Sequence, residues 1–301
     1  MRAERMLRTM TLVSRAVAGP FSVAMATFRA ATTDRVSLAA AGSGFWATTA
    51  LFPAISALVS IYGLLFDPLS AASQLGMLSD FLPGPAFELV DQRVQQLVHA
   101  PSRELSAQFL VGVGLTLWSA STGTKAVLSA LNIAYDTPET RGIIRFQLTG
   151  LALTVLAMLG AVMAIAVVVL LPAAIILIGL SRFSAALLHT GGLGLIVSFF
   201  AGAVTILYRY GPSRGRLAHA RTFPGVMAAT VIWLGASGAL SYYIGHLGNF
   251  GATYGSIGAV IGIMLWFYLS AYSVLLGAEL NAQLELRALE CSTQARPDTQ
   301  Q

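Results

Sequence analysis

The chain consists of long apolar stretches separated by short segments that hold nearly all of its charges. Six stretches lack Asp, Glu, Lys and Arg, and each is long enough for a helix to cross about 30 Å of hydrocarbon, which needs roughly 20 residues. Transmembrane strands would alternate apolar and polar residues, whereas these stretches are apolar on all sides. We therefore predict six transmembrane helices, at about residues 36–66, 105–124, 146–172, 183–208, 222–245 and 254–278.

Composition agrees with a lipid environment. Of the 301 residues, 56% are hydrophobic and only 10% are charged, against about 25% charged in soluble domains. The first and third stretches are longer than one crossing needs and contain Pro53 and Pro172, so we expect bends there, with residues 173–181 running along the membrane surface. The predicted fold class is an all-α integral membrane protein with a six-helix transmembrane domain at 36–287.

The basic residues indicate how the helices thread the membrane. Positively charged segments close to the ends of spans are retained in the cytoplasm. Fifteen of the 18 Lys and Arg residues lie in the N-terminal segment, in the connections after the second and fourth stretches, and in the C-terminal tail. Only Arg93, Arg103 and Arg182 lie in connections on the opposite side. We therefore predict that both termini are cytoplasmic.

The N-terminal segment, residues 1–35, is predicted to form an amphipathic helix on the membrane surface. Phe21 and Phe28 fall on its apolar face and Arg29 on the opposite face. A cleaved signal peptide is an alternative, because Ala24 and Ala26 are spaced like the small residues before a cleavage site. Cleavage would expose the arginine-rich connections on the wrong side of the membrane, so the surface helix is favoured.

The connection 67–104 is the one sizeable connection on the predicted outer side. Pro85 can open a helix whose apolar face begins at Phe87 and whose polar face begins at Glu88. We predict short amphipathic helices that cap the bundle, and a gate for a partner or substrate is the alternative. The cytoplasmic tail, 288–301, is polar without a periodic apolar face, and we predict that it is disordered.

The sequence lacks the residue patterns of common catalytic and cofactor sites. His99, His189, His219 and His246 are scattered over segments that cannot converge, and no Gly-rich phosphate loop is followed by Lys and Ser or Thr. Cys291 is the only cysteine. Positive-inside orientation explains the cytoplasmic arginines without nucleic-acid binding. We predict no catalytic residues, no metal, no cofactor and no nucleic-acid partner.

Polar residues near the cytoplasmic ends of the second and sixth stretches are the candidates for a transport pathway. No stretch has a charged residue near its centre, where proton-coupled carriers commonly place one. Interfacial snorkelling and helix-end capping explain Lys125 and Glu279, and an ion pair between them that shapes an inner gate is the alternative. The candidate pathway or gate residues are Trp118, Ser119, Ser121, Lys125, Asn132, Tyr254, Glu279 and Asn281.

Glycines four residues apart recur along the last stretch. Small residues at this spacing let helices approach closely, within one chain or between copies, so a homo-oligomer stays open. The alternative is that these glycines line a pathway. The predicted helix-packing residues are Gly251, Gly255, Gly258 and Gly262.

Four sequence segments together resemble one protein family. They are AAAGSGFWATTALFPAISALVSIYGL at 39–64, LWSASTGTKAVLSALNIAYDTPETRG at 117–142, YRYGPSRGR at 208–216 and NFGATYGSIGAVIGIMLWFYLSAYSVLLGAELNAQLE at 249–285. Their order and spacing resemble the YihY/BrkB family of bacterial inner-membrane proteins, once labelled ribonuclease BN. The resemblance covers roughly residues 36–287. It implies six helices, termini inside, and a multi-pass protein of the bacterial inner membrane.

The activity that the resemblance implies is less defined. The family is associated with envelope integrity, with serum resistance in virulence, and with movement of lipid-like molecules. Our leading hypothesis is transport or translocation of a lipid or other amphipathic envelope molecule, with membrane lipids as partners. A scaffold that stabilises an envelope complex without transport is the alternative. A membrane-associated ribonuclease is a remote third hypothesis, because this sequence lacks the His and Asp cluster that such an enzyme needs.

Overall fold

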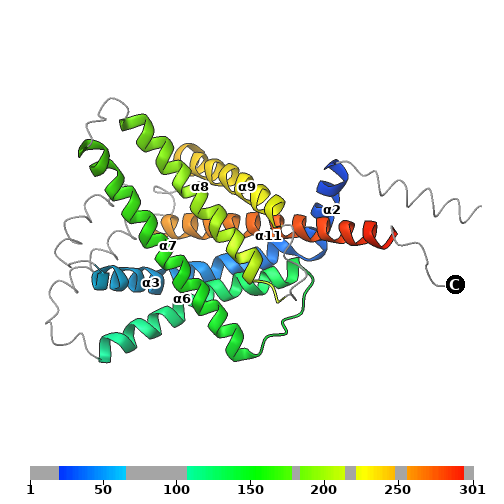
Figure 1. The fold of residues 1–301 in the computed structure, drawn as a ribbon, viewed down its shortest axis with the longest axis horizontal. Coiled ribbons are helices and arrows are strands. Elements are labelled where there is room, and N and C mark those ends of the chain that lie inside the picture. Colours follow the sequence, from blue (N-terminus) through cyan, green and yellow to red (C-terminus); the bar gives the residue numbers. More distant parts are fainter. Residues whose placement is uncertain (1–19, 66–106, 178–183, 214–221, 248–255, 295–301) are drawn as a thin grey trace, which may run out of the picture.

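The computed structural model describes residues 20–65, 107–177, 184–213, 222–247 and 256–294, and every regular element within these ranges is helical (Figure 1). This confirms the predicted helical class. The elements are α2 (Pro20–Thr33), α3 (Val36–Leu65), α6 (Ala107–Ala134), α7 (Ile143–Leu177), α8 (Ser184–Tyr210), α9 (Phe223–Tyr242), the π-helical segment η2 (Tyr243–Leu247) and α11 (Ser256–Gln294).

Each predicted apolar stretch coincides with a helix. Among the described residues, three helices contain a segment long and apolar enough to cross a membrane, and α8 contributes a shorter apolar segment, Gly194–Tyr210. The three long segments are Ile143–Gly160, Phe223–Gly245 and Val260–Leu289. The other predicted spans stay predictions, and the amphipathic helices expected at 67–104 lie outside the described residues.

α2 forms part of the helix expected in the N-terminal segment. It begins at Pro20, whose fixed φ suits the first helical position, while residues 1–19 lie outside the described ranges. Thr27 and Ala31 are buried on the side that packs against α11, whereas Phe21 and Phe28 are 78% and 59% exposed. α2 therefore has one packed face and one exposed apolar face.

Two helices extend beyond the predicted boundaries. α7 stays helical through Pro172 to Leu177, where the sequence pattern predicts a turn along the membrane surface. α11 stays helical to Gln294, so residues 288–294, which were predicted to be disordered, are helical, and residues 295–301 lie outside the described ranges. Packing on α2 explains this difference, because Arg287 donates hydrogen bonds to the backbone oxygen and the hydroxyl of Ser22.

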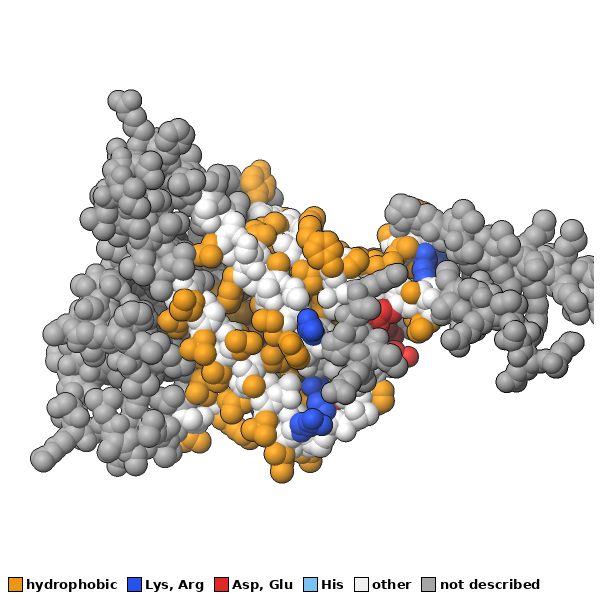
Figure 2. Space-filling view, in the orientation of Figure 1, with side chains coloured by type: hydrophobic (Ala, Val, Ile, Leu, Met, Phe, Trp, Pro, Cys, Tyr) orange, Lys and Arg blue, Asp and Glu red, His pale blue; other side chains and the backbone are white. Residues whose placement is uncertain are grey.

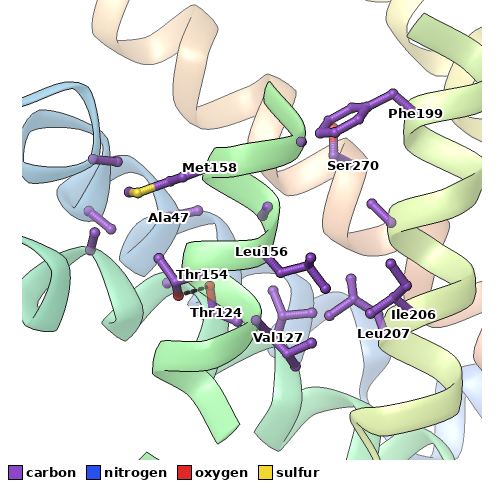
Figure 3. A pocket seen from close by; sticks show the side chains of 18 of the residues that line it. Ala47, Thr124, Val127, Thr154, Leu156, Met158, Phe199, Ile206, Leu207 and Ser270 are labelled. Carbon is purple, nitrogen blue, oxygen red and sulfur yellow. Dashed lines mark hydrogen bonds between the residues drawn. The ribbon is translucent and has the colours of Figure 1, made fainter. Parts of the chain in front are cut away.

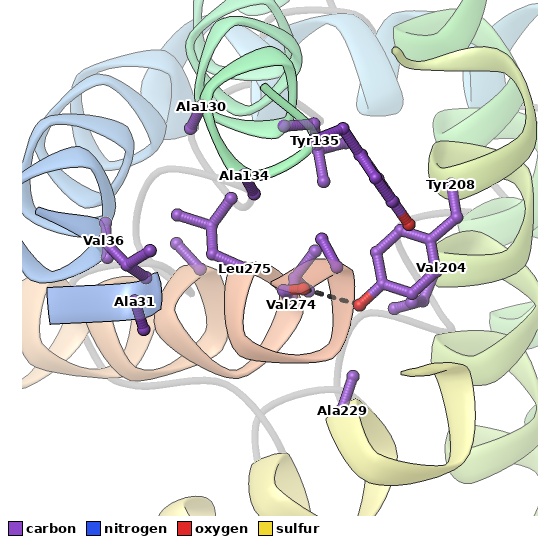
Figure 4. Packing of buried hydrophobic residues seen from close by; sticks show 14 of the residues in the cluster. Ala31, Val36, Ala130, Ala134, Tyr135, Val204, Tyr208, Ala229, Val274 and Leu275 are labelled. Atoms are coloured by element: carbon purple, nitrogen blue, oxygen red, sulfur yellow. Dashed lines mark hydrogen bonds between the residues drawn. The ribbon is translucent and has the colours of Figure 1, made fainter. Parts of the chain in front are cut away.

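α3 contacts both α6 and α11, and α9 contacts α11. In Figure 1, α7, α8 and α9 run at an incline to α11. The largest cluster of buried apolar side chains lies where α6, α8, α9 and α11 meet (Figure 4). Tyr208 points into this cluster from α8 and donates a hydrogen bond of 2.5 Å to the backbone oxygen of Val274. The Tyr208 and Tyr135 rings meet edge to face at 6.2 Å.

Glycines set the closest helix contacts. A β-carbon on Gly225 would collide with the backbone oxygen of Gly277 and the amide of Asn281, so α9 and α11 touch backbone to backbone. A β-carbon on Gly44 would lie 3.0 Å from the backbone nitrogen of Tyr268, so α3 also approaches α11 closely. The residues in these contacts are far apart in the sequence, so no regular spacing along the chain predicts them.

The glycines singled out in the last stretch are described only in part. Gly251 and Gly255 lie outside the described residues. Gly258 is buried, and a β-carbon on Gly262 would make an ordinary contact of 3.4 Å with the side chain of Ile244. A role of this series in packing between copies of the chain stays a prediction.

We predict that Gly225→Ala destabilises the protein by about 1–3 kcal/mol, because the added methyl group overpacks a backbone contact that cannot yield like a flexible side chain. The measurement is the thermal unfolding midpoint of purified protein in detergent. Gly235→Ala is the matched control in the same helix, since its β-carbon meets nothing within 4 Å. Equal midpoints for the two variants would contradict the prediction.

Candidate functional site

A cavity of about 860 Å³ lies among α3, α6, α7, α8 and α11 (Figure 3). Its walls owe their shape to small residues, including Ala47 and Ala50 of α3, Gly123 of α6 and Gly202 of α8. Larger apolar side chains such as Met158 complete the lining. The cavity is therefore a space among the helices that small side chains leave unfilled.

Three of the polar side chains in the cavity wall, Thr124, Thr154 and Ser270, are hydrogen-bonded. The hydroxyls of Thr124 and Thr154 are 2.8 Å apart, and Thr154 also donates to the backbone oxygen of Gly150. Ser270 accepts a hydrogen bond of 3.0 Å from the indole nitrogen of Trp233. No charged side chain of the described residues lines the cavity. Its chemistry suits an apolar occupant, since a polar one would lose hydrogen bonds to water without replacement.

The cavity reaches the molecular surface between α7 and α8. Leu159 and Met163 of α7 line it and are 43% and 64% exposed, and Phe199 of α8 lines it at 38% exposed. The Phe199 ring sits against Gly160, where a β-carbon would collide with the ring edge. A single aromatic side chain on a glycine therefore forms much of the contact beside this opening.

A second polar feature, here named the polar clamp, joins the connection after α6 to the chain just after α8. It consists of Asn132, Glu139, Arg141, Gly211 and Ser213. Asn132 donates to Glu139 at 2.8 Å and accepts from the backbone nitrogen of Ser213 at 2.9 Å. Arg141 donates to both carboxylate oxygens of Glu139, at 2.7 Å each, and to the backbone oxygen of Gly211 at 2.9 Å.

Arginine fixes the charge state of the clamp. The Arg141 guanidinium beside Glu139 holds the pKa of that carboxyl at about 2, below its usual 4.5, with smaller support from the Asn132 amide. The side chains are 12% exposed for Arg141 and 30% for Glu139, so water weakens the ion pair only in part. At neutral pH the clamp therefore contains a full carboxylate and a full guanidinium.

Asn281 joins three segments in the neighbouring core. Its side chain is fully buried; the amide oxygen accepts from the backbone nitrogen of Gly225 at 2.8 Å. Its amide nitrogen donates to the backbone oxygen of Thr222 at 3.2 Å and to the Tyr135 hydroxyl at 3.3 Å. The start of α9 and the end of α6 are thereby fixed to α11, which explains a buried amide in an apolar helix.

Glu279 is the one candidate with an unmet hydrogen bond. It is 1% exposed, its carboxyl lies within hydrogen-bonding reach of Asp34 at the turn between α2 and α3, and its Oε1 has no partner among the described residues. It does not pair with Lys125. The Lys125 ammonium donates instead to Gln147 at 2.7 Å and lies 5.1 Å from the centroid of the Trp118 ring. The proposed ion pair between Lys125 and Glu279 is therefore wrong.

None of the described pathway candidates lines the cavity. Asn132 belongs to the clamp and Asn281 to the core beside it, whereas Trp118 and Ser119 are exposed on the outer face of α6. Ser121 is buried and donates to the backbone oxygen of Trp118 at 2.6 Å. Tyr254 lies outside the described residues. Any role of these residues in a pathway stays a prediction.

The residues that do line the cavity were not found from the sequence. Ser43, Ala47, Ala50 and Ala54 recur at three- and four-residue spacing in α3, a signal of one small-residue face. That signal does not distinguish a cavity wall from close helix packing. In the part of the chain that the structure describes, no group of three or more His, Cys, Asp or Glu side chains is placed to hold a metal ion.

We predict that Glu139→Gln lowers the free energy of unfolding by about 1 kcal/mol at pH 7, because it removes a charge-assisted pair that is partly exposed. Because the folded pKa is depressed, the carboxylate stabilises the fold above about pH 4.5, and this stabilisation is lost as pH falls toward about 2. Thermal unfolding of both proteins should therefore show a gap that closes on acidification.

Asp136→Asn is the control for the loss of one negative charge in the same connection, since Asp136 has no ion pair within 4.0 Å among the described residues. A gap between wild type and Glu139→Gln that is independent of pH, or an equal gap for the control, would show that Arg141 does not act through the carboxylate.

Comparison with known proteins gives consistent matches. The family model described as Virulence factor BrkB matches residues 27–301. The ribonuclease-like protein YfkH of Bacillus subtilis (strain 168) is 34% identical over 250 residues, which are 79% of this chain and 86% of that protein. No solved structure matches.

Shorter matches join the chain to membrane proteins. A UPF0761 membrane protein of Tolumonas auensis is 34% identical over 84 residues, 28% of this chain and 27% of that protein. One of Xanthomonas campestris pv. campestris (strain 8004) is 33% identical over 82 residues, 27% and 19% of the two chains. Since the family match runs from residue 27 to the last residue, this chain belongs to the BrkB family of membrane proteins, the family that its sequence segments resemble.

Proposed function

We propose that this protein translocates a lipid or another amphipathic envelope molecule across the bacterial inner membrane and thereby supports envelope integrity. The observation that carries the proposal is the apolar cavity with its opening between α7 and α8. Its volume of about 860 Å³ lies within the range of roughly 300–1,000 Å³ typical of small-molecule sites. Membership of a membrane protein family supports a bundle whose opening faces lipid.

The cavity suits the chains of an amphipathic molecule better than its headgroup. The hydroxyls of Thr124, Thr154 and Ser270 are already hydrogen-bonded, and no charged side chain of the described residues lines the cavity, so a headgroup inside would lose water with little compensation. A chain can enter sideways past Phe199 and Gly160 while the headgroup stays beside the helices in the polar part of the membrane. Translocation then requires the headgroup to follow the seam between α7 and α8.

We infer six spans, formed by α3, α6, α7, α8, α9 with η2, and α11. The arginine distribution supports an orientation with the polar clamp, α2 and both termini in the cytoplasm. Figure 2 agrees with this arrangement, because apolar side chains cover the middle of the described surface and basic side chains gather toward the end where α2 lies. The clamp then fixes the cytoplasmic ends of α6, α7 and α8.

We predict that Gly202→Trp blocks translocation while leaving the fold intact. Gly202 lines the cavity, and a β-carbon there meets nothing within 4 Å, so a larger side chain can begin at this position without a clash at its first atom, and we expect the indole to fill the cavity. The measurement is transfer of labelled phospholipid or glycolipid between leaflets of vesicles that contain the purified protein. We expect the rate to fall at least tenfold, toward the level of empty vesicles.

Gly194→Trp is the matched control, since Gly194 is an exposed glycine of the same helix that also meets nothing within 4 Å and does not line the cavity. It should keep the wild-type rate. If wild-type protein moves no more lipid than empty vesicles, the translocation proposal fails and a non-transporting scaffold is favoured. If both variants transfer lipid normally, the cavity is not the route.

The proposed orientation predicts that a cysteine at Gly215 is protected in intact cells. In a Cys291→Ser background, Gly215→Cys should react with a membrane-impermeant maleimide only after the cells are opened, because the connection after α8 faces the cytoplasm. Ser79→Cys, in the predicted outer connection, should react in intact cells and serves as the control. Labelling of residue 215 from outside would reverse the orientation.

A further inference from the structure

Lys125 lies at the surface of the bundle, along the seam between α6 and α7, in a space that its neighbours leave for it. Its stem packs against Gly150, where any β-carbon would collide with the lysine, so a glycine of α7 makes room for it. Its ammonium is held by the Gln147 side-chain oxygen at 2.7 Å and lies 5.1 Å from the centroid of the Trp118 ring. These contacts fix the position of the charge without neutralising it.

The Lys125 charge has no anionic partner in the part of the chain that the structure describes. The one ion pair within 4.0 Å there joins Arg141 to Glu139. An ammonium has three donors, and Gln147 accepts from one of them. A cation in surroundings of low dielectric constant gains strongly from an anion that completes its contacts. The seam is therefore a site for a negatively charged group from outside the chain.

The side chains around this seam are apolar and face outward. Leu115 and Trp118 of α6 are 64% and 50% exposed, and Ile144 and Leu148 of α7 are 77% and 58% exposed. Gln147 lies four residues after the start of α7, which corresponds to roughly 6 Å along the helix axis. A molecule bound here therefore presents its charge near a helix end and its apolar part along the bundle.

We propose that this seam binds an anionic phospholipid, with the headgroup phosphate on Lys125 and Gln147 and the acyl chains on Leu115 and Leu148. Trp118 borders the headgroup. A phospholipid fits because one molecule supplies both the anion and the apolar chains, which a free phosphate does not. The site requires that the bundle lies in a membrane, but it does not require translocation, since none of these five residues lines the cavity.

The test uses the full-length protein in nanodiscs of phosphatidylcholine, into which brominated phosphatidylglycerol is introduced in steps. Bromine quenches tryptophan fluorescence on close contact, and Trp118 reports on the seam. The fluorescence of Trp118 is obtained by subtracting the signal of the same protein that also carries Trp118→Phe from the signal of each protein. Brominated phosphatidylcholine is the neutral probe. Wild type should be half-quenched at a lower mole fraction of the anionic lipid than of the neutral one.

Lys125→Gln should raise the mole fraction of phosphatidylglycerol at half-quenching about fivefold, as expected for one basic residue against an anionic lipid, and Lys125→Arg should keep most of the selectivity. Arg209→Gln removes the same charge from an exposed position on α8 and should leave the curve unchanged. Circular dichroism and gel filtration check that the variants are folded.

Equal quenching of the wild type by the two brominated lipids would overturn the proposal without any variant. If Lys125→Gln gave the same quenching curve as the wild type, the proposal would also be overturned. An equal shift for Arg209→Gln would overturn it too, because binding of the anionic lipid would then depend on the overall charge of the protein. The readout involves no transfer between leaflets, so failure here and failure of translocation are separate results.

Discussion

The arrangement of the helices depends on one buried amide. In a bundle surrounded by lipid, polar groups have to find their partners inside the protein, because no water is available to them. Asn281 meets this requirement with Gly225, Thr222 and Tyr135, which belong to two other segments of the chain. The contact is available only because glycines let α9 and α11 touch. Loss of the amide would remove three hydrogen bonds that join α11 to these two segments.

The bundle combines a tightly bonded end with a loosely filled middle. At the bonded end, the polar clamp and the Asn281 contacts join α6, α7, α8, α9 and α11 through charged and amide groups. In the middle, α7 and α8 are kept apart by the cavity and meet at Gly160 and Phe199. Separation of α7 from α8 in the middle therefore breaks few polar contacts, whereas separation at the clamp breaks several.

The sequence predicted the helices well because the apolar pattern is local. A run of about 20 uncharged residues is visible without knowledge of its neighbours, and each run coincides with a helix. Helix contacts are not local. Gly225 and Gly277 lie far apart in the chain and share no spacing, so the regular series from Gly251 to Gly262 drew attention instead. The cavity was missed for a related reason, since small side chains define it only in combination.

The candidate residues show the same difference between local features, which the sequence reveals, and contacts between distant segments, which it does not. Asn132 and Asn281 were identified as polar residues in apolar surroundings, and both prove to be points where segments are joined. Their partners include the backbone groups of Ser213, Gly225 and Thr222, which leave no trace in a sequence. Lys125 was matched with Glu279 because the two are oppositely charged, but Gln147 and Trp118 hold the lysine on another face. Charge alone does not specify which side of a helix a residue occupies.

The length of α11 has a mechanical consequence. Its 39 residues span about 58 Å, nearly twice the thickness of the hydrocarbon layer, and its sequence contains no proline at which it could bend. Phe267 and Ser270 stand in the cavity wall, while Arg287 is bonded to α2 well beyond it. Because α11 is one continuous helix, a rotation of its C-terminal part, where it contacts α2, would be transmitted along the helix to the cavity wall.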